Sequence, residues 1–148
     1  MADERPSLDI PPHQFEFVPW SPEVEVQTIQ SMDIGIMPLR DTLWSRGKCS
    51  YKMLLYMSCG VPVVVSSIGM NAEILEMASI GQTASSADEW ISTLEAVIGD
   101  HSLASAMGKQ GRLVALKSFS IDVLAGRLAT ELLRVAGHES NVTPTSNQ

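Results

Sequence analysis

The stretch RGKCSYKMLLYMSCGVPVVV, residues 46–65, decides the expected fold of this chain. Its middle part, residues 49–59, has the apolar spacing of a helix, and Gly60 directly after it is a typical helix terminator. Residues 61–67 are β-branched and apolar on both faces, which is typical of a strand that is covered on both sides. A helix that leads straight into a buried strand indicates the crossover of a parallel sheet.

The segments on either side extend this pattern. Residues 33–38 form a short apolar strand before the helix, residues 80–84 form a further strand after it, and residues 15–19 alternate as a strand does. Alternating strands and helices predict an α/β fold. We expect a short parallel sheet joined by helical crossovers, with further helices at the C-terminal end.

Helix signals flank these strands. Residues 21–32 carry a serine and a proline at the positions that start a helix, and Ser86 with Glu89 three residues later forms a capping box. Ser120 is placed to cap the last helix, and residues 39–48 are expected to be a loop.

Glycines and polar terminal segments suggest where helices end and where the chain is flexible. We expect the helix before Ser120 to be interrupted near Gly108 or Gly111, since glycine is a poor helix former. We further expect residues 1–14 to be a flexible tail, residues 15–135 a partial domain and residues 136–148 a disordered tail.

Composition excludes several classes of protein. The chain has 148 residues, 45% of them hydrophobic, and a net charge of −7, which argues against nucleic acid as a partner. No apolar run reaches the roughly 18 residues of a membrane span, so membrane association is expected to be peripheral at most. Cys49 and Cys59 are too far apart on one helix to bridge, which suggests reduced thiols, a cytoplasmic protein and no metal site.

A basic cluster stands out against this acidic background. Four of the ten basic residues lie between positions 40 and 52, opposed only by Asp41, and the rest of the chain has six basic and sixteen acidic residues. Loop 39–48 and turn 67–71 both follow strands, so both open on the carboxyl edge of the sheet, where ligands bind. Lys48 and Lys52 share one face at the start of helix 49–59. The cluster predicts a site for a phosphate-bearing ligand; the alternative is a solvated loop.

Residues 32–75, MDIGIMPLRDTLWSRGKCSYKMLLYMSCGVPVVVSSIGMNAEIL, add a more specific signal. This segment resembles the donor-binding region of retaining GT-B glycosyltransferases of the group 4 type, through its Gly-Lys loop, its Gly-Val-Pro turn and the later Gly-x-Asn-x-Glu. The resemblance implies a nucleotide-sugar as substrate, no other cofactor, no metal and no catalytic residue assigned in this chain. The donor and diphosphate site that it implies comprises Arg46, Lys48, Ser50, Lys52, Gly69, Asn71 and Glu73.

The chain also departs from this family. Gly47 and Leu55 occupy the two positions where many members carry glutamates that contact the sugar and the ribose. By this resemblance we expect the acceptor domain and the first strands of the donor domain to be absent, so the expected fold is an incomplete Rossmann-like three-layer sandwich with a short parallel sheet and C-terminal helices. We therefore expect strand 33–38 to have an open edge, covered by residues 15–19, by a missing N-terminal domain or by a second chain.

Two functions follow from the resemblance. The first is the donor-binding segment of an enzyme that transfers a sugar from a nucleotide-sugar to a carbohydrate or lipid-linked acceptor, inactive as an isolated chain. The alternative is a non-catalytic remnant or partner protein that binds phosphate ligands or another subunit.

Three further side chains have two interpretations each. Trp20 and Trp44 flank the crevice loops, where packing beneath the loops is favoured over stacking on a sugar. Glu73 either contacts the donor sugar or faces the N-terminus of its own short helix.

Overall fold

The structure is a computed structural model and describes residues 5–137. Three short strands, β1 (Gly35–Met37), β2 (Val63–Val65) and β3 (Gly81–Thr83), form one parallel sheet in the order β1-β2-β3. In the register of this sheet Val63 lies between Gly35 and Gly81. The expected parallel pairing of the strands, and with it the α/β fold, is confirmed.

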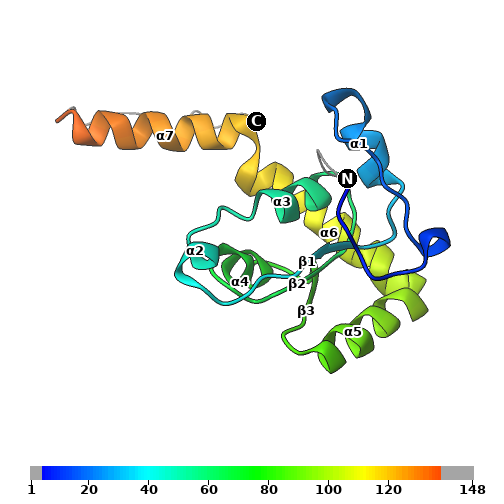
Figure 1. The fold of residues 1–148 in the computed structure, drawn as a ribbon. Helices are drawn as coiled ribbons and strands as arrows, with labels where there is room; N and C mark the ends of the chain where they lie inside the picture. The colour runs from blue at the N-terminus through cyan, green and yellow to red at the C-terminus, as the bar shows by residue number, and fades with distance from the viewer. Residues whose placement is uncertain (1–4, 138–148) are drawn as a thin grey trace.

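Helices surround this sheet, with α3 on one face and α5 on the other (Figure 1). The last helix, α7, projects away from the rest of the chain. The helical elements are a 3-10 helix η1 (Pro12–Gln14), α1 (Pro22–Gln30), α2 (Leu43–Arg46), α3 (Tyr51–Ser58), α4 (Met70–Leu75), α5 (Ala87–Gly99), α6 (His101–Phe119) and α7 (Ile121–Val135).

Helix α3 ends at a glycine, as the sequence predicts. Gly60 has a φ of 77° and donates its backbone N–H to the carbonyl of Met57 at 2.9 Å. The N–H of Val61 reaches back to the carbonyl of Tyr56 at 3.0 Å. These two bonds form a Schellman motif, which satisfies the last carbonyls of the helix and turns the chain into β2.

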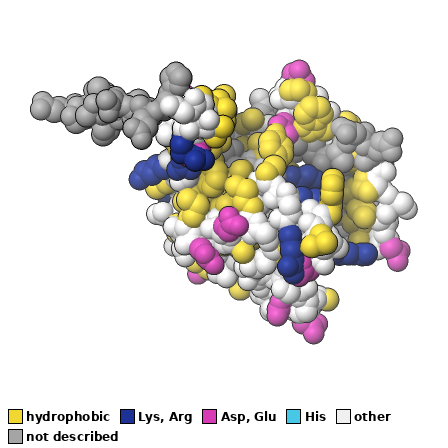
Figure 2. All heavy atoms as spheres, turned by 90° about the vertical axis from the view of Figure 1, so that its left-hand side faces the viewer, with side chains coloured by type: hydrophobic (Ala, Val, Ile, Leu, Met, Phe, Trp, Pro, Cys, Tyr) yellow, Lys and Arg dark blue, Asp and Glu magenta, His cyan; other side chains and the backbone are white. Residues whose placement is uncertain are grey.

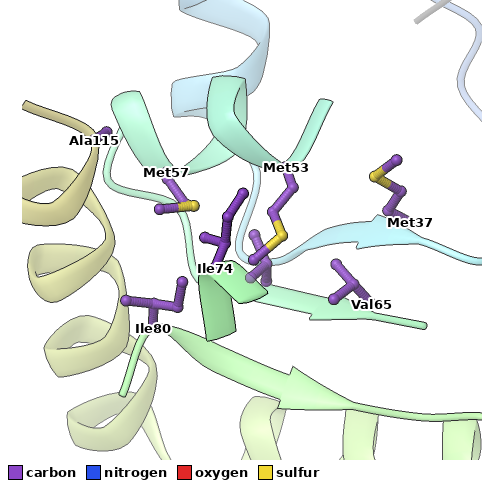
Figure 3. Close-up of a cluster of buried hydrophobic side chains, with 8 residues drawn as sticks. Met37, Met53, Met57, Val65, Ile74, Ile80 and Ala115 are labelled. Carbon is purple, nitrogen blue, oxygen red and sulfur yellow. The ribbon is translucent and has the colours of Figure 1, made fainter. Parts of the chain in front are cut away.

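The valines of β2 build the core on both faces of the sheet. Val63 and Val65 face a cluster that includes Met53 and Met57 of α3 (Figure 3). Val64 points to the opposite face and packs in a second cluster that contains Ala84 and Val97. Successive side chains of a strand point to opposite faces, so β2 is covered on both sides, as expected.

Two predictions before α3 are wrong. Residues 15–19 do not form a strand, and of these residues only Pro19 makes an isolated β-bridge. Proline has no N–H with which to continue a ladder. Residues 39–48 are not all loop, because Thr42 caps α2 by accepting a hydrogen bond from the N–H of Ser45 at 3.1 Å.

The predicted interruption of the long helix is also wrong. Helix α6 runs without a break through Gly108 and Gly111, and both glycines are buried. A methyl group at Gly108 would overlap the carbonyl oxygen of Gly60, and one at Gly111 would touch Met57 at 3.4 Å. These glycines therefore allow α6 to lie close to the end of α3, and this packing outweighs their low helix propensity.

The remaining boundary predictions have mixed outcomes. Ser86 and Glu89 form the expected capping box of α5. Ser120 is the N-cap of α7, although its side chain makes no capping hydrogen bond. Most of the expected C-terminal tail, residues 138–148, lies outside the described residues, and the start of the chain contains the short helix η1.

The core packing predicts a difference between two methionines. Met57 is fully buried between α3 and the sheet, whereas Met77 is 47% exposed. Met57→Ala should lower the free energy of unfolding by about 2–5 kcal/mol, because it leaves a cavity. Met77→Ala should change it by less than about 0.5 kcal/mol. Urea denaturation of both variants measures this difference, and equal losses would contradict the packing.

Candidate functional site

The loops that follow β1 and β2 meet at one point. Gly69 has φ 54° and ψ −136°, a conformation largely confined to glycine. A methyl group at Gly69 would lie 2.5 Å from the carbonyl oxygen of Arg46. The hydroxyl of Ser66, at the end of β2, also accepts a hydrogen bond from the N–H of Leu39 at 3.0 Å. The two loops are therefore held together at the carboxyl edge of the sheet, as expected for loops that follow two parallel strands.

A pocket of about 300 Å³ lies where the loops meet. It is lined by Asp41, Arg46, Ser67, Ile68 and Gly69. The carboxyl edge of parallel strands is the usual place for ligands in α/β folds. The structure thus brings two of the predicted site residues, Arg46 and Gly69, to one pocket, and adds Asp41, Ser67 and Ile68, which the sequence did not single out as ligand contacts.

Arg46 is engaged with Asp41 in this pocket. Its Nε donates to Oδ1 of Asp41 at 2.7 Å, and its second guanidinium nitrogen donates to Oδ2 at 2.9 Å. The hydrogen bond and charge of Arg46 lower the pKa of Asp41, and the same contact raises the pKa of Arg46. Both side chains are more than half exposed, so a ligand can reach the pair. An anion that binds here competes with Asp41 for the guanidinium or shares it.

Ser50, the residue before α3, has an unusual backbone conformation. It is buried and has a φ of 55°, and it is the only residue other than glycine with a positive φ among residues 5–137. Its carbonyl accepts the N–H of Leu54 at 3.0 Å, but its side chain does not cap the helix. The first-turn amides of α3 therefore have no side-chain cap, which suits an anion at this end.

The two lysines of the cluster are exposed. Lys48 precedes α3 and Lys52 lies in its first turn. Neither side chain makes an ion pair within the described part of the chain, and neither lines the pocket. Both ammonium groups are available to a ligand.

Asn71 and Glu73 lie on the first turn of α4. Asn71 is fully buried and its Nδ2 donates to the carbonyl of Ser66 at 3.1 Å. Its Oδ1 is also buried and has no hydrogen-bonding partner within residues 5–137. Glu73 is exposed, and α4 has no side-chain cap. The buried amide of Asn71 thus fixes the turn that follows β2. A contact of Asn71 or Glu73 with a nucleotide-sugar remains a prediction.

Leu55 does not face the pocket. It lines a separate apolar groove of about 330 Å³ between α3 and α6, together with Tyr51, Leu54, Leu116 and Phe119. Leu55, the position at which the resemblance implies a ribose-binding glutamate in many family members, therefore lies beside α6 and away from the pocket.

The favoured interpretation of two tryptophans is wrong. Trp20 is 46% exposed and donates its Nε1–H to Glu25 at 2.7 Å, and Trp44, on α2, is 81% exposed. Neither ring packs beneath the loops. Trp44 and Leu43, which is 89% exposed, belong to the short helix that also carries Arg46.

The comparison with protein families identifies the chain. Residues 3–100, about two thirds of the sequence, match the family described as glycosyl transferases group 1. The chain belongs to this glycosyltransferase family, which confirms the resemblance found in residues 32–75. Comparison with curated proteins and with solved structures gave no match. Helices α6 and α7 lie beyond the matched residues.

Other kinds of site were also sought. In the described range, no group of three or more histidine, cysteine, aspartate or glutamate side chains could hold a metal ion. No helix between residues 5 and 137 is both long and apolar enough to span a bilayer. Cys49 and Cys59 are both free thiols, as expected.

Substitution by alanine should have opposite effects on stability at Gly69, where the two loops touch, and at Gly126, which is on α7. Gly69→Ala should lower stability by about 1–3 kcal/mol, because the new methyl group meets the Arg46 backbone in a strained conformation. Gly126→Ala, on α7, has nothing within 4 Å of the added carbon and should raise stability by up to about 1 kcal/mol. Denaturation with urea tests both variants, and a Gly69→Ala protein as stable as the parent would be inconsistent with the loop contact.

The Asp41–Arg46 pair predicts a pH effect. Because Arg46 lowers the folded-state pKa of Asp41, the pair stabilises the protein fully above the unfolded-state value of about 3.9. This contribution is lost as the pH falls through the lower folded-state pKa. NMR titration of the Asp41 carboxyl should give a pKa below 3.9 in the parent. Arg46→Ala should raise this pKa toward 3.9, whereas Arg40→Ala should leave it unchanged.

Proposed function

We propose that this chain binds the diphosphate group of a nucleotide-sugar at the pocket between the loops after β1 and β2. The observation that carries the proposal is the close approach of Gly69 to the Arg46 backbone, which brings the two loops together around a pocket lined by Asp41, Arg46, Ser67, Ile68 and Gly69. Membership of a glycosyltransferase family supports a phosphate-bearing sugar donor as the ligand.

Each basic group has a distinct part in this proposal. Lys52 and the uncapped amides of α3 are the main donors to the diphosphate. Lys48 and Arg46 add supporting positive charge, and Arg46 turns one edge of its guanidinium from Asp41 to the ligand. Ser50 sets the direction in which the first amides of α3 point, and Gly69 lets its loop approach the Arg46 backbone.

The corresponding reaction is transfer of the sugar from the nucleotide-sugar to a carbohydrate or lipid-linked acceptor. In such a reaction the cations stabilise the negative charge of the departing diphosphate. A pocket of about 300 Å³ is at the small end for ligand sites, so it fits part of a donor and leaves the sugar and base outside. We propose that these 148 residues alone bind a donor without transferring its sugar.

Completion of the site would come from another domain or a second chain over β1. Strand β1 is at the edge of the sheet, and Ile36 on it is 48% exposed. Edge strands with apolar side chains are ready places for pairing.

A second function, phosphate binding without any transfer, is favoured by Leu55. A leucine cannot accept a hydrogen bond from a ribose, and this one lies in the apolar groove beside α6. A protein of this kind would bind pyrophosphate and a nucleotide-sugar equally well, because only the phosphates are recognised.

Binding can be measured by NMR titration at low salt with pyrophosphate, a nucleoside diphosphate and nucleotide-sugars. Shifts should centre on residues 46–52 and 66–69. Lys52→Ala should weaken binding about tenfold or more, since a charge-assisted hydrogen bond contributes about 1.5–3 kcal/mol.

The matched control is Lys117→Ala, which removes a lysine in the last turn of α6. This variant should bind as the parent does. Equal binding by the parent and both variants, or shifts over the whole surface, would show that the cluster is a solvated loop. Tighter binding of a nucleotide-sugar than of pyrophosphate supports donor recognition, and equal binding supports the second function.

A further inference from the structure

Helix α7 presents an apolar stripe that no described residue covers. None of its residues is buried, although it is strongly amphipathic. Figure 2 looks onto the side of the molecule from which α7 projects and shows several hydrophobic side chains over the middle of this face. The α7 stripe consists of Ile121 (82% exposed), Leu124 (44%), Leu128 (61%), Leu132 (60%) and Val135 (77%).

The stripe is symmetric about its centre. Counted from Leu128, the other members lie seven and four residues before it and four and seven residues after it. With 3.6 residues per turn, all of them fall within about 40° of one line along the helix, which is about 22 Å long. The spacing of these apolar side chains is therefore the same in both directions along the helix axis, with a β-branched residue at each end.

We propose that the α7 stripe binds α7 of a second copy of this chain in an antiparallel pair, with the two-fold axis at Leu128. Reversal of the partner then places Ile121 at the height of the partner's Val135, and Leu124 at the height of the partner's Leu132. The two Leu128 side chains meet at the axis. Such a contact is isologous, so the pair closes as a dimer.

Charges beside the stripe favour this direction. Arg127 and Glu131 lie on the same flank of α7, at about 100° and 60° from the centre of the stripe. In the antiparallel pair Arg127 is only two residues, about 3 Å along the axis, from the partner's Glu131. The antiparallel pair therefore contains two such contacts, in which Arg127 shares the partner's Glu131 with Arg134 of that partner helix, since Arg134 Nε donates to Glu131 Oε2 at 2.8 Å within each α7.

A parallel pair lacks this complementarity. There the Arg127 flank would meet the opposite flank of the partner, where the nearest acidic residue, the partner's Asp122, is five residues or about 7.5 Å away along the axis. The body of the protein is also attached at the N-terminal end of α7 (Figure 1). Antiparallel helices place the two bodies at opposite ends, whereas parallel helices would bring them together.

Net charge points the same way. Helix α7 is neutral, with Asp122 and Glu131 balanced by Arg127 and Arg134, while the whole chain has a charge of −7. Contact through α7 thus joins two copies at a neutral element and keeps the acidic bodies apart.

The apolar groove between α3 and α6 extends this surface. Its lining includes Leu116, Phe119 and Ser120, and α7 begins at the next residue. In the antiparallel pair the end of the partner's α7 lies at the height of Ile121, beside this groove. The groove therefore adds apolar area at both ends of the contact.

The first test is analytical ultracentrifugation of the full chain from micromolar to millimolar concentration. The parent should form a dimer that dissociates on dilution. Leu128→Arg places two arginines at the axis and should weaken association at least a hundredfold. Ile98→Arg changes an exposed isoleucine on α5 (65% exposed) and should associate as the parent does.

The second test addresses direction. Arg127→Glu and Glu131→Arg should each weaken the dimer about tenfold, because each sets like charges against each other. The double variant, or an equimolar mixture of the two single variants, should restore association, since opposite charges then face each other again. Circular dichroism checks that α7 remains helical in each variant.

Two results of the first test would overturn the proposal. One is a parent protein that stays monomeric at every concentration, which would assign the stripe to a different partner. The other is a Leu128→Arg variant that associates as strongly as the parent. Absence of rescue in the double variant and in the mixture would also overturn the antiparallel arrangement.

Discussion

The packing of β2 between two layers is the constraint on which the rest of the molecule depends. Val63 and Val65 pack against α3 and α6, and Val64 packs against α5, so the three-residue strand is buried on both sides. With only three residues per strand, the sheet has few ladder hydrogen bonds, and side-chain burial must hold it together. The close approach of α6 to the end of α3, made possible by Gly108, completes this core.

The pocket is a consequence of that core. Because β1 and β2 are parallel and in register, the loops after them leave the sheet at the same edge. Gly69 and the Ser66 hydroxyl then fix the distance between the loops. The Gly60 turn fixes where α3 ends and β2 begins, and Ser50 fixes how α3 begins. The position of the basic cluster is thus determined by backbone geometry more than by the lysine side chains, which remain exposed.

The same chain has two surfaces of opposite character. The pocket edge is polar and holds an exposed ion pair that a charged ligand can open. Helix α7 is neutral in net charge, and its apolar stripe is exposed in the described part of the chain. The family match covers the first surface and ends before the second. The ligand binding and the association that we propose therefore fall on separate parts of the structure, so each can be tested with variants that leave the other surface unchanged.

The sequence by itself determined the α/β class, a helix expected over residues 49–59 that spans residues 51–58, its end at Gly60, the parallel pairing of residues 33–38 with residues 61–66 and the glycosyltransferase family. These features depend on local patterns: apolar periodicity, a capping box, a terminating glycine and a conspicuous motif. Only the tertiary structure decided that Asp41 holds Arg46, that Asn71 is buried and that Leu55 faces α6. It also decided that Gly108 allows close packing where the sequence suggested a break, and that residues 15–19 do not join the sheet. Such features depend on contacts between segments far apart in the chain, which no local pattern contains.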